Sequence, residues 1–237
     1  MSKVWGVTVG TNYDKSKLPS GGLTDDQSAL LTSLKDWYDK ENYEWMTASL
    51  SPPTSIFEVN AKKSVTFSWS FSEEVSSVTF NGEAQPTTQT GSVTIKDITS
   101  SKPGTTFSYT VSGTRKDGNK ETKNATASVS FHNKYYFGCA AKPTTIDSAF
   151  IKKLTMESDW ARSRKTFSKT VKCAEGEYIW YAYPSRLGTS MFKMGGFQGG
   201  FAPVHVVTFK NDSEYEESYY VYQSSKSGLG DIIIDVL

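Results

Sequence analysis

The clearest pattern along the chain is a strict alternation of large apolar and hydroxyl side chains between residues 64 and 72. In Ser64-Val65-Thr66-Phe67-Ser68-Trp69-Ser70-Phe71-Ser72, every second residue is large and apolar, and the residues between are Ser or Thr. Successive side chains of a strand point to opposite faces, so this segment predicts a strand with one buried face. Further alternating segments, separated by turn signals such as Asn81-Gly82, continue to Phe131. The pattern predicts an immunoglobulin-like β-sandwich over residues 55–131, with Trp69 in its core.

The first 54 residues have a different pattern, which predicts an arm with one helix. Thr24-Asp25-Asp26-Gln27 is a capping box, and the apolar residues that follow recur at helical spacing to about Lys40. A lone helix of this length is marginal in water, so its apolar stripe needs a partner. Ser51-Pro52-Pro53-Thr54 interrupts local structure and marks the predicted domain boundary.

Residues 132–237 predict a second β domain with one helix. Thr145-Ile146-Asp147 opens a helix that carries Ile146, Phe150, Leu154 and Trp160 on its inner side. Strands are expected at about 165–172, 177–183, 204–209, 217–223 and 231–237, because Gly-rich or polar segments separate these stretches. The fold class is therefore mainly β: an N-terminal arm with one helix, an Ig-like sandwich, and a C-terminal β domain with one helix.

The aromatic segment from Tyr178 to Tyr183 is the first candidate for a binding surface. As a strand it places Tyr178 and Trp180 on one face and Ile179, Tyr181 and Tyr183 on the other, so both faces are apolar. Two interpretations stay open. One face binds protein or sugar rings, for which flat aromatic side chains are suited, or the helix over residues 145–162 covers it.

The glycine-rich segment Gly195-Gly196-Phe197-Gln198-Gly199-Gly200-Phe201 is the second candidate. It lacks the Lys-Ser/Thr ending of a phosphate-binding loop. We interpret it as a tight bend whose two phenylalanines anchor it to a core. The alternative is a protein contact at the loop tip, where glycine lets another backbone approach closely.

Residue types that carry chemistry do not form a constellation in this sequence. His132 and His205 have no metal-ligand or nucleophile context, and Glu73-Glu74 and Glu216-Glu217 are adjacent on strands and are interpreted as solvated edge charges. We therefore predict no enzyme activity, no catalytic residues, no cofactor and no metal. The formal net charge of +1 favours neither nucleic acid nor membrane as a partner. For Cys139 and Cys173 we favour two buried thiols over a cross-strand disulfide.

Four aromatic motifs in the C-terminal part carry a resemblance to a known group of proteins. They are Tyr135-Tyr136-Phe137-Gly138, Tyr178–Pro184 followed by Arg186-Leu187-Gly188, Phe192-Lys193-Met194-Gly195-Gly196-Phe197, and Tyr219-Tyr220-Val221-Tyr222. This series resembles the C-terminal domain of bacteriophage virion proteins of the tail, fibre or head-appendage type, in which the domain follows an Ig-like module. The resemblance implies a structural component of the virion, made in the host cytoplasm, and it carries over no catalytic residue.

The resulting functional hypothesis is a non-enzymatic virion protein that mediates particle assembly or surface attachment. Its expected partners are other virion proteins, further copies of the same chain, and a glycan or protein of the host surface. The alternative is a carbohydrate-binding adhesin that recognises bacterial surface glycans. The candidate interface residues are Trp5, Leu30, Leu34, Trp37, Trp180, Phe197 and Phe201.

Overall fold

The computed structural model describes residues 2–4, 7–9, 30, 32–34, 44–117, 120–163, 166–202 and 205–237. The chain is mainly β, as predicted, and divides into two compact units, Met1–Trp45 and Met46–Leu237. In the first unit, β1 (Ser2–Val4) pairs antiparallel with β2 (Val7–Val9), and residues 30 and 32–34 are helical. Leu30 and Leu34 are 65% and 59% exposed, while Trp5 and Trp37 lie outside the described residues.

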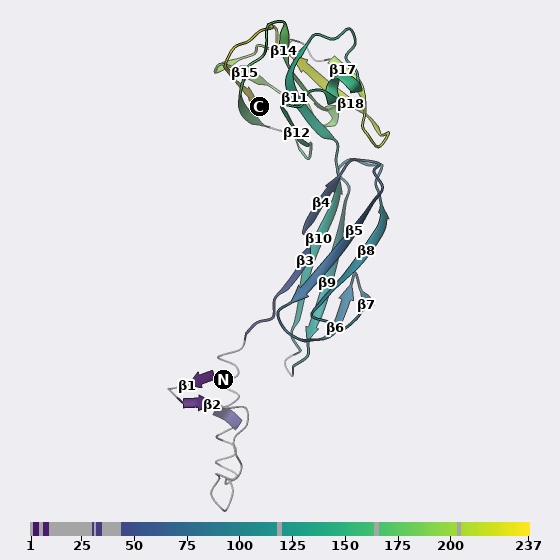
Figure 1. Cartoon of the computed structure of the whole chain (residues 1–237), viewed down its shortest axis with the longest axis vertical. Helices are drawn as coiled ribbons and strands as arrows, with labels where there is room; N and C mark the ends of the chain where they lie inside the picture. The colour runs from purple at the N-terminus through teal and green to yellow at the C-terminus, as the bar shows by residue number, and fades with distance from the viewer. Residues whose placement is uncertain are drawn as a thin grey trace, which may run out of the picture. The chain divides into compact units, whose positions relative to one another are not determined.

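Two sheets form the sandwich, one with the order β3-β5-β8 and one with the order β4-β10-β9-β6-β7. Figure 1 labels the strands of these two sheets. β4 runs parallel to β10 and the other neighbours are antiparallel. This arrangement is that of an immunoglobulin-like sandwich. The strands are β3 (Ala48–Ser51), β4 (Thr54–Phe57), β5 (Lys63–Phe71), β6 (Val75–Phe80), β7 (Glu83–Gln85), β8 (Thr90–Ile98), β9 (Thr106–Arg115) and β10 (Thr122–Phe131).

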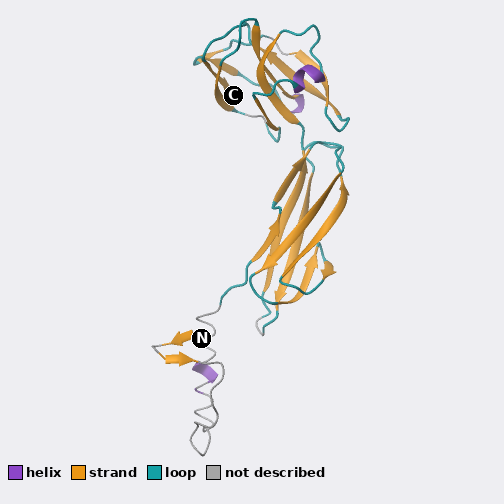
Figure 2. Ribbon diagram, in the orientation of Figure 1, coloured by secondary structure: helices purple, strands orange, loops and turns teal. Residues whose placement is uncertain are grey.

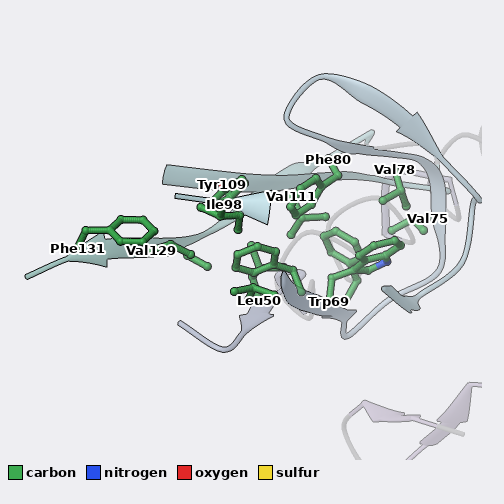
Figure 3. Packing of buried hydrophobic residues seen from close by; sticks show 14 of the residues in the cluster. Leu50, Trp69, Val75, Val78, Phe80, Ile98, Tyr109, Val111, Val129 and Phe131 are labelled. Atoms are coloured by element: carbon green, nitrogen blue, oxygen red, sulfur yellow. The ribbon is translucent and has the colours of Figure 1, made fainter. Parts of the chain in front are cut away.

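The alternation of β5 places its apolar residues in the core of the sandwich, with Trp69 buried as predicted (Figure 3). The Phe67 ring lies 4.7 Å from the Tyr109 ring and 5.7 Å from the Phe80 ring. Gly91 is opposite Trp69 in the register of β5 and β8. A Cβ atom at Gly91 would overlap the Trp69 ring, so glycine is what lets this indole pack against the neighbouring strand.

The outer faces of the sandwich carry hydroxyl side chains that pair across strands. The Oγ1 atoms of Thr66 and Thr94 are 2.8 Å apart, and those of Thr114 and Thr122 are 3.1 Å apart. Each such Thr pair stabilises the neighbouring strands by roughly 0.2–1 kcal/mol. The hydroxyl positions of the sequence alternation are therefore a hydrogen-bonded surface.

The sandwich begins earlier than the predicted boundary at residue 54. β3 pairs with β5 from Ala48 to Ser51, so this strand belongs to the sandwich and not to the arm. Pro52 and Pro53 separate β3 from β4, which lie in different sheets. The Pro-Pro signal thus marks a crossing between two sheets of one domain, because proline ends the pairing of one strand without ending the domain.

The C-terminal domain packs a sheet with the order β12-β11-β14-β18-β17 against a sheet with the order β13-β19-β15-β16 (Figure 2). The strands are β11 (Lys134–Ala141), β12 (Glu157–Trp160), β13 (Phe167–Val171), β14 (Glu177–Pro184), β15 (Phe192–Met194), β16 (Phe197–Gln198), β17 (His205–Lys210), β18 (Glu216–Gln223) and β19 (Ile232–Val236). The helical elements are α2 (Ser148–Lys152) and the 3-10 turn η2 (Ser185–Leu187). Within the described residues, no helix is long and apolar enough to span a membrane.

The predicted helix from residue 145 to Trp160 is wrong in length. Asp147 caps α2 by accepting a hydrogen bond from the Phe150 N–H at 2.8 Å, but the helix ends at Lys152. The following chain turns onto β11, where Thr155 bridges to Phe137 and β12 pairs with the strand. A Cβ atom on Gly138 would lie only 3.3 Å from the Leu154 Cα. Pairing with the edge of β11 has therefore overridden the helical spacing of the apolar residues.

Candidate interaction surface

The strand β14 is buried on both faces, which settles the two interpretations of its aromatic residues. Trp180 is fully buried; its Nε1–H donates to the Ala140 carbonyl at 2.9 Å, and the Phe150 ring of α2 lies edge-on to it at 4.8 Å. On the other face, Tyr181 and Tyr183 pack in the core between the two sheets. Trp180 is therefore not an interface residue, because α2 covers the face that the sequence left open.

A group of buried hydroxyls lies where β14 and β18 approach the loop before β15. The Ser190 N–H donates to the Tyr222 hydroxyl at 2.9 Å, and the Ser190 Oγ–H donates to the Tyr183 hydroxyl at 3.1 Å. The Tyr183 hydroxyl donates to the Gly188 carbonyl. Burial raises the pKa of the neighbouring Tyr181 hydroxyl far above its usual range. The hydrogen-bonded hydroxyls of Tyr183, Ser190 and Tyr222 hold the base of the next hairpin.

The glycine-rich segment forms a hairpin that projects one phenylalanine and packs the other, partly buried, against the core. Gly195 and Gly196 both have positive φ angles, 58° and 86°, and form the turn between β15 and β16. Phe201 stacks on Phe192 at 4.1 Å between ring centroids, as predicted for an anchor. Phe197 is 81% exposed, so the expectation that it also anchors the bend is wrong. Phe197 lies on β16, the outermost strand of the sheet, and pairs across the turn with Met194 of β15.

A shallow pocket of about 400 Å³ opens beside this hairpin. Phe192, Phe201 and Tyr222 contribute aromatic carbon to its wall, and Gln198 contributes an amide. The exposed side chain of Met191 forms part of the rim. None of the residues lining the pocket carries a formal charge. The pocket thus suits an uncharged ligand group with an apolar face. We define the hairpin surface as Met191, Phe197, Gln198 and Phe201.

The hairpin surface is attached firmly to the sheet behind it. The Ala202 N–H donates to the Gln223 carbonyl at 2.7 Å, and the Ser225 N–H donates to the Gly200 carbonyl at 2.9 Å. The Gly199 N–H donates to the Phe192 carbonyl at 2.9 Å. These bonds fix both ends of the segment that carries Phe197, so its side chain is presented on a defined backbone.

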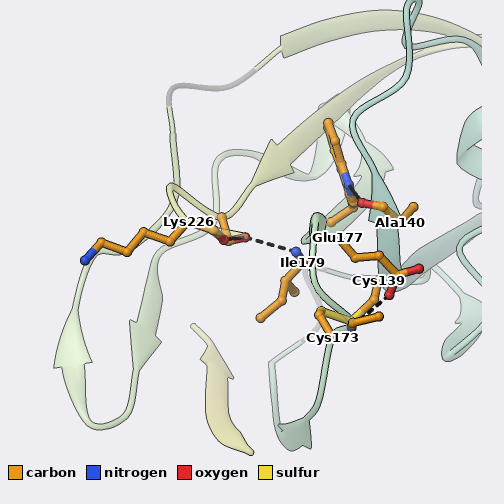
Figure 4. Close-up of a disulfide and its surroundings, with 9 residues drawn as sticks. Cys139, Ala140, Cys173, Glu177, Ile179 and Lys226 are labelled. Carbon is orange, nitrogen blue, oxygen red and sulfur yellow. Dashed lines mark hydrogen bonds between the residues drawn. A yellow bond between two sulfur atoms is a disulfide. The ribbon is translucent and has the colours of Figure 1, made fainter. Parts of the chain in front are cut away.

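Cys139 and Cys173 form a disulfide, with their Cα atoms 5.5 Å apart (Figure 4). The prediction of two free buried thiols is therefore wrong. Cys139 lies on β11, and Cys173 follows β13 in the other sheet. The bond thus links β11 of one sheet to the segment that follows β13 of the other sheet. The sequence spacing did not define that these two positions face each other.

The histidines and carboxylates of the sequence do not assemble a reactive group among the described residues. His205 is exposed on β17, whereas His132 is buried. Glu217 is not a solvated edge charge as expected, since its side chain is only 9% exposed. It accepts hydrogen bonds from Asn133 Nδ2 and Arg186 Nε, both at 2.7 Å. Within the residues that the structure describes, no cluster of His, Cys, Asp or Glu could hold a metal ion.

The same region joins the sandwich to the C-terminal domain. Asn211 Nδ2 donates to the Val59 carbonyl and to Asn133 Oδ1, both at 2.9 Å. The Asp212 N–H donates to Glu58 Oε2 at 3.1 Å. Tyr215 packs against the hydrophobic core of the sandwich. The loop between β17 and β18 therefore contacts the turn after β4 through both polar and apolar groups.

His132 gives this junction a predictable pH dependence. Burial, together with the positive charges of Arg186 and Arg162, lowers the pKa of His132 below its usual 6.5. The unfolded chain then binds the proton more tightly than the folded chain, so the free energy of unfolding is expected to fall as pH decreases below about 6.5. Urea titrations of the wild type and His132→Gln between pH 7.5 and 5.5 measure this difference. A wild-type loss no larger than that of His132→Gln would contradict the assignment.

Comparisons with known proteins identify no family for this chain. No protein-family model matches the chain, and no curated protein matches it. Among solved structures, the N-terminal eight Ig domains of Down syndrome cell adhesion molecule (DSCAM), isoform 1.30.30, align over 80% of this chain, with 11% identity and a TM-score of 0.28. The chain spans about a quarter, 26%, of that structure.

Proposed function

We propose that this chain is a non-enzymatic structural protein of a bacteriophage particle, which contacts a neighbouring virion protein or the host surface through the hairpin surface. Support for the phage context comes from the four aromatic motifs of the C-terminal domain. Support for a contact role comes from the molecule itself, in which two β domains follow one another and the second presents an apolar tip.

The exposure of Phe197 carries the proposal. An isolated exposed apolar side chain is common on protein surfaces, but this one stands on a backbone fastened by hydrogen bonds at Gly199, Gly200 and Ala202. Met191 adds a second exposed apolar side chain close by. Its sulfur lies 3.8 Å from the side-chain amide nitrogen of Gln198. Aromatic side chains held in place lose little conformational entropy on binding and often dominate the energy of an interface.

Incorporation into particles tests the proposal. An antibody against the full chain should label purified virions of the producing phage, and the chain should co-sediment with them through a density gradient. We expect Phe197→Ser to fold normally and to reduce incorporation or host adsorption by roughly tenfold or more, since a central aromatic contact contributes at least 1–2 kcal/mol. Ser168→Ala, on an exposed position of β13, serves as the control. Recovery of the chain only outside particles would contradict the proposal.

The pocket beside the hairpin favours a second candidate, a carbohydrate-binding adhesin. Its uncharged wall combines aromatic rings with the Gln198 amide, a combination suited to the apolar face and the hydroxyls of a neutral sugar ring. The full chain should then give a signal on an array of bacterial surface glycans, and Gln198→Ala should remove it. Absence of signal from the folded wild-type chain would exclude this candidate for the glycans tested.

A further inference from the structure

The four sheets of the sandwich and the C-terminal domain end in eight edge strands, and seven of them are short. β3, β4, β7, β12, β13, β16 and β17 have between two and six residues. Several carry a further safeguard, such as Pro52 and Pro53 between β3 and β4, or Glu157 and Asp159 in β12. Short length, proline and charge are the devices that prevent edge strands from pairing with other chains.

The edge strand β8 lacks these safeguards. It is nine residues long, and its first six residues, Thr90-Gly91-Ser92-Val93-Thr94-Ile95, contain neither proline nor a charged side chain. The first charge is Lys96, and regular pairing ends at a bulge where Asp97 has a φ of 53°. Regular pairing with β5 therefore runs from Thr90 to Ile95, and Lys96 leads into the bulge.

The backbone of β8 presents alternate residues to the open side. The Gln89 carbonyl accepts a hydrogen bond from the Phe71 N–H on β5, so odd-numbered residues point toward β5. Even-numbered residues then point away from it. Thr88 Oγ1 donates to the outward Thr90 carbonyl at 2.7 Å. Ser92, Thr94 and Lys96 are exposed, and no described strand pairs with this side of β8.

The side chains of β8 also indicate a missing neighbour. Val93 and Ile95 point into the sandwich and pack against its core, yet both stay only partly buried. The apolar residues opposite them on β5, Phe67 and Val65, are buried. In sandwiches whose sheet has the order ABED, a further strand lies beside the strand that corresponds to β8. An added strand would cover the exposed flanks of Val93 and Ile95.

We propose that β8 is the contact through which two copies of this chain associate, by antiparallel pairing of β8 with β8 about a two-fold axis at Val93. The outward residues Thr90, Ser92, Thr94 and Lys96 are spaced symmetrically about Val93, so this register pairs each of them with an outward residue of the other copy. Ser92 of one copy then pairs with Thr94 of the other, and the outward backbone groups of both meet. The same pairing gives hydrogen-bond partners to the outward backbone groups of β8 in both copies, as expected for an isologous interface.

Side-chain complementarity in this register favours a second copy as the occupant. On the core side Val93 meets its own symmetry mate, and Ile95 lies opposite Gly91, which leaves room for the larger side chain. On the outer side Lys96 lies opposite Thr90, and the two lysines are at opposite ends of the paired strands. No like charges face each other, and every apolar side chain of the edge meets a small or apolar partner.

The mass of the full chain in solution tests the proposal, which does not depend on the proposed function. Sedimentation of the wild type should show a dimer, and Ser92→Pro should shift it to a monomer. Proline removes an N–H that points away from β5, so the sandwich keeps its own ladder. Ser92→Ala keeps that N–H and should stay dimeric. A monomeric wild type, or a dimer that survives in folded Ser92→Pro, overturns the proposal.

Cysteine crosslinking provides a second readout that does not require the proline variant to fold. Val93→Cys should form a disulfide-linked dimer under mild oxidation, since the two positions face each other across the axis. Ser49→Cys, on the opposite edge strand β3, is the matched control. We expect crosslinking of Val93→Cys to be at least tenfold faster. Equal rates for the two variants would show that β8 is not the contact.

Discussion

Replacing Trp180 with alanine is expected to lower the free energy of unfolding of the C-terminal domain by about 3–5 kcal/mol. The indole is fully buried between α2 and the sheet, so its removal loses apolar burial and leaves a cavity. It also removes the hydrogen bond, 2.9 Å between Trp180 Nε1 and the Ala140 oxygen, that the Ala140 carbonyl accepts. Urea unfolding followed by circular dichroism measures the loss, and Trp180→Phe, which keeps most of the volume, should lose clearly less.

The exposed aromatic of the same domain provides the matched comparison. Phe197→Ala removes a large side chain that is 81% exposed, and surface changes of this kind shift stability by about 0.5 kcal/mol or less. Two aromatic residues that the sequence ranked together as interface candidates should therefore differ severalfold in their effect on folding. Similar losses for Trp180→Ala and Phe197→Ala would contradict the assignment of one to the core and the other to the surface.

Removal of the Cys139–Cys173 disulfide is expected to lower the free energy of unfolding by an amount similar to that of Trp180→Ala. The bond closes a loop with a sequence separation of 34 residues, for which the chain-entropy model gives about 3–4 kcal/mol. Thermal unfolding with and without reductant measures this effect. The double variant Cys139→Ala/Cys173→Ala should be destabilised and should no longer respond to reductant. A wild-type melting temperature unaffected by complete reduction would contradict a stabilising role.

The sandwich was predictable because the sequence of β5 alternates without interruption. In β5 each apolar residue is followed by Ser or Thr, and a period of two specifies a half-buried strand. The length of the C-terminal helix was not predictable, because strand pairing between distant segments determines where that helix ends. The helical spacing from Ile146 to Trp160 continued past the point where the chain pairs with β11, and local patterns carry no signal for such an edge. β15 and β16 were missed because strands of two or three residues show no period.

The candidate surface was predictable only in part, for a related reason. Aromatic clustering located the correct domain, but exposure depends on which element covers each face. Trp180 and Phe197 have similar apolar character, and α2 covers only the first. The disulfide was missed because facing Cβ atoms on two different sheets are a property of the packed domain and not of the spacing between cysteines.

The hydroxyl-covered faces of the sandwich have a consequence for the conditions that this domain tolerates. Paired groups such as Thr66 with Thr94 and Thr110 with Thr126 do not ionise in the range where proteins are stable, and salt does not screen them as it screens ion pairs. The hydrogen bonds of these Thr pairs are accordingly independent of acidity and ionic strength. Transfer of this domain from dilute to concentrated salt therefore leaves these cross-strand contacts unchanged.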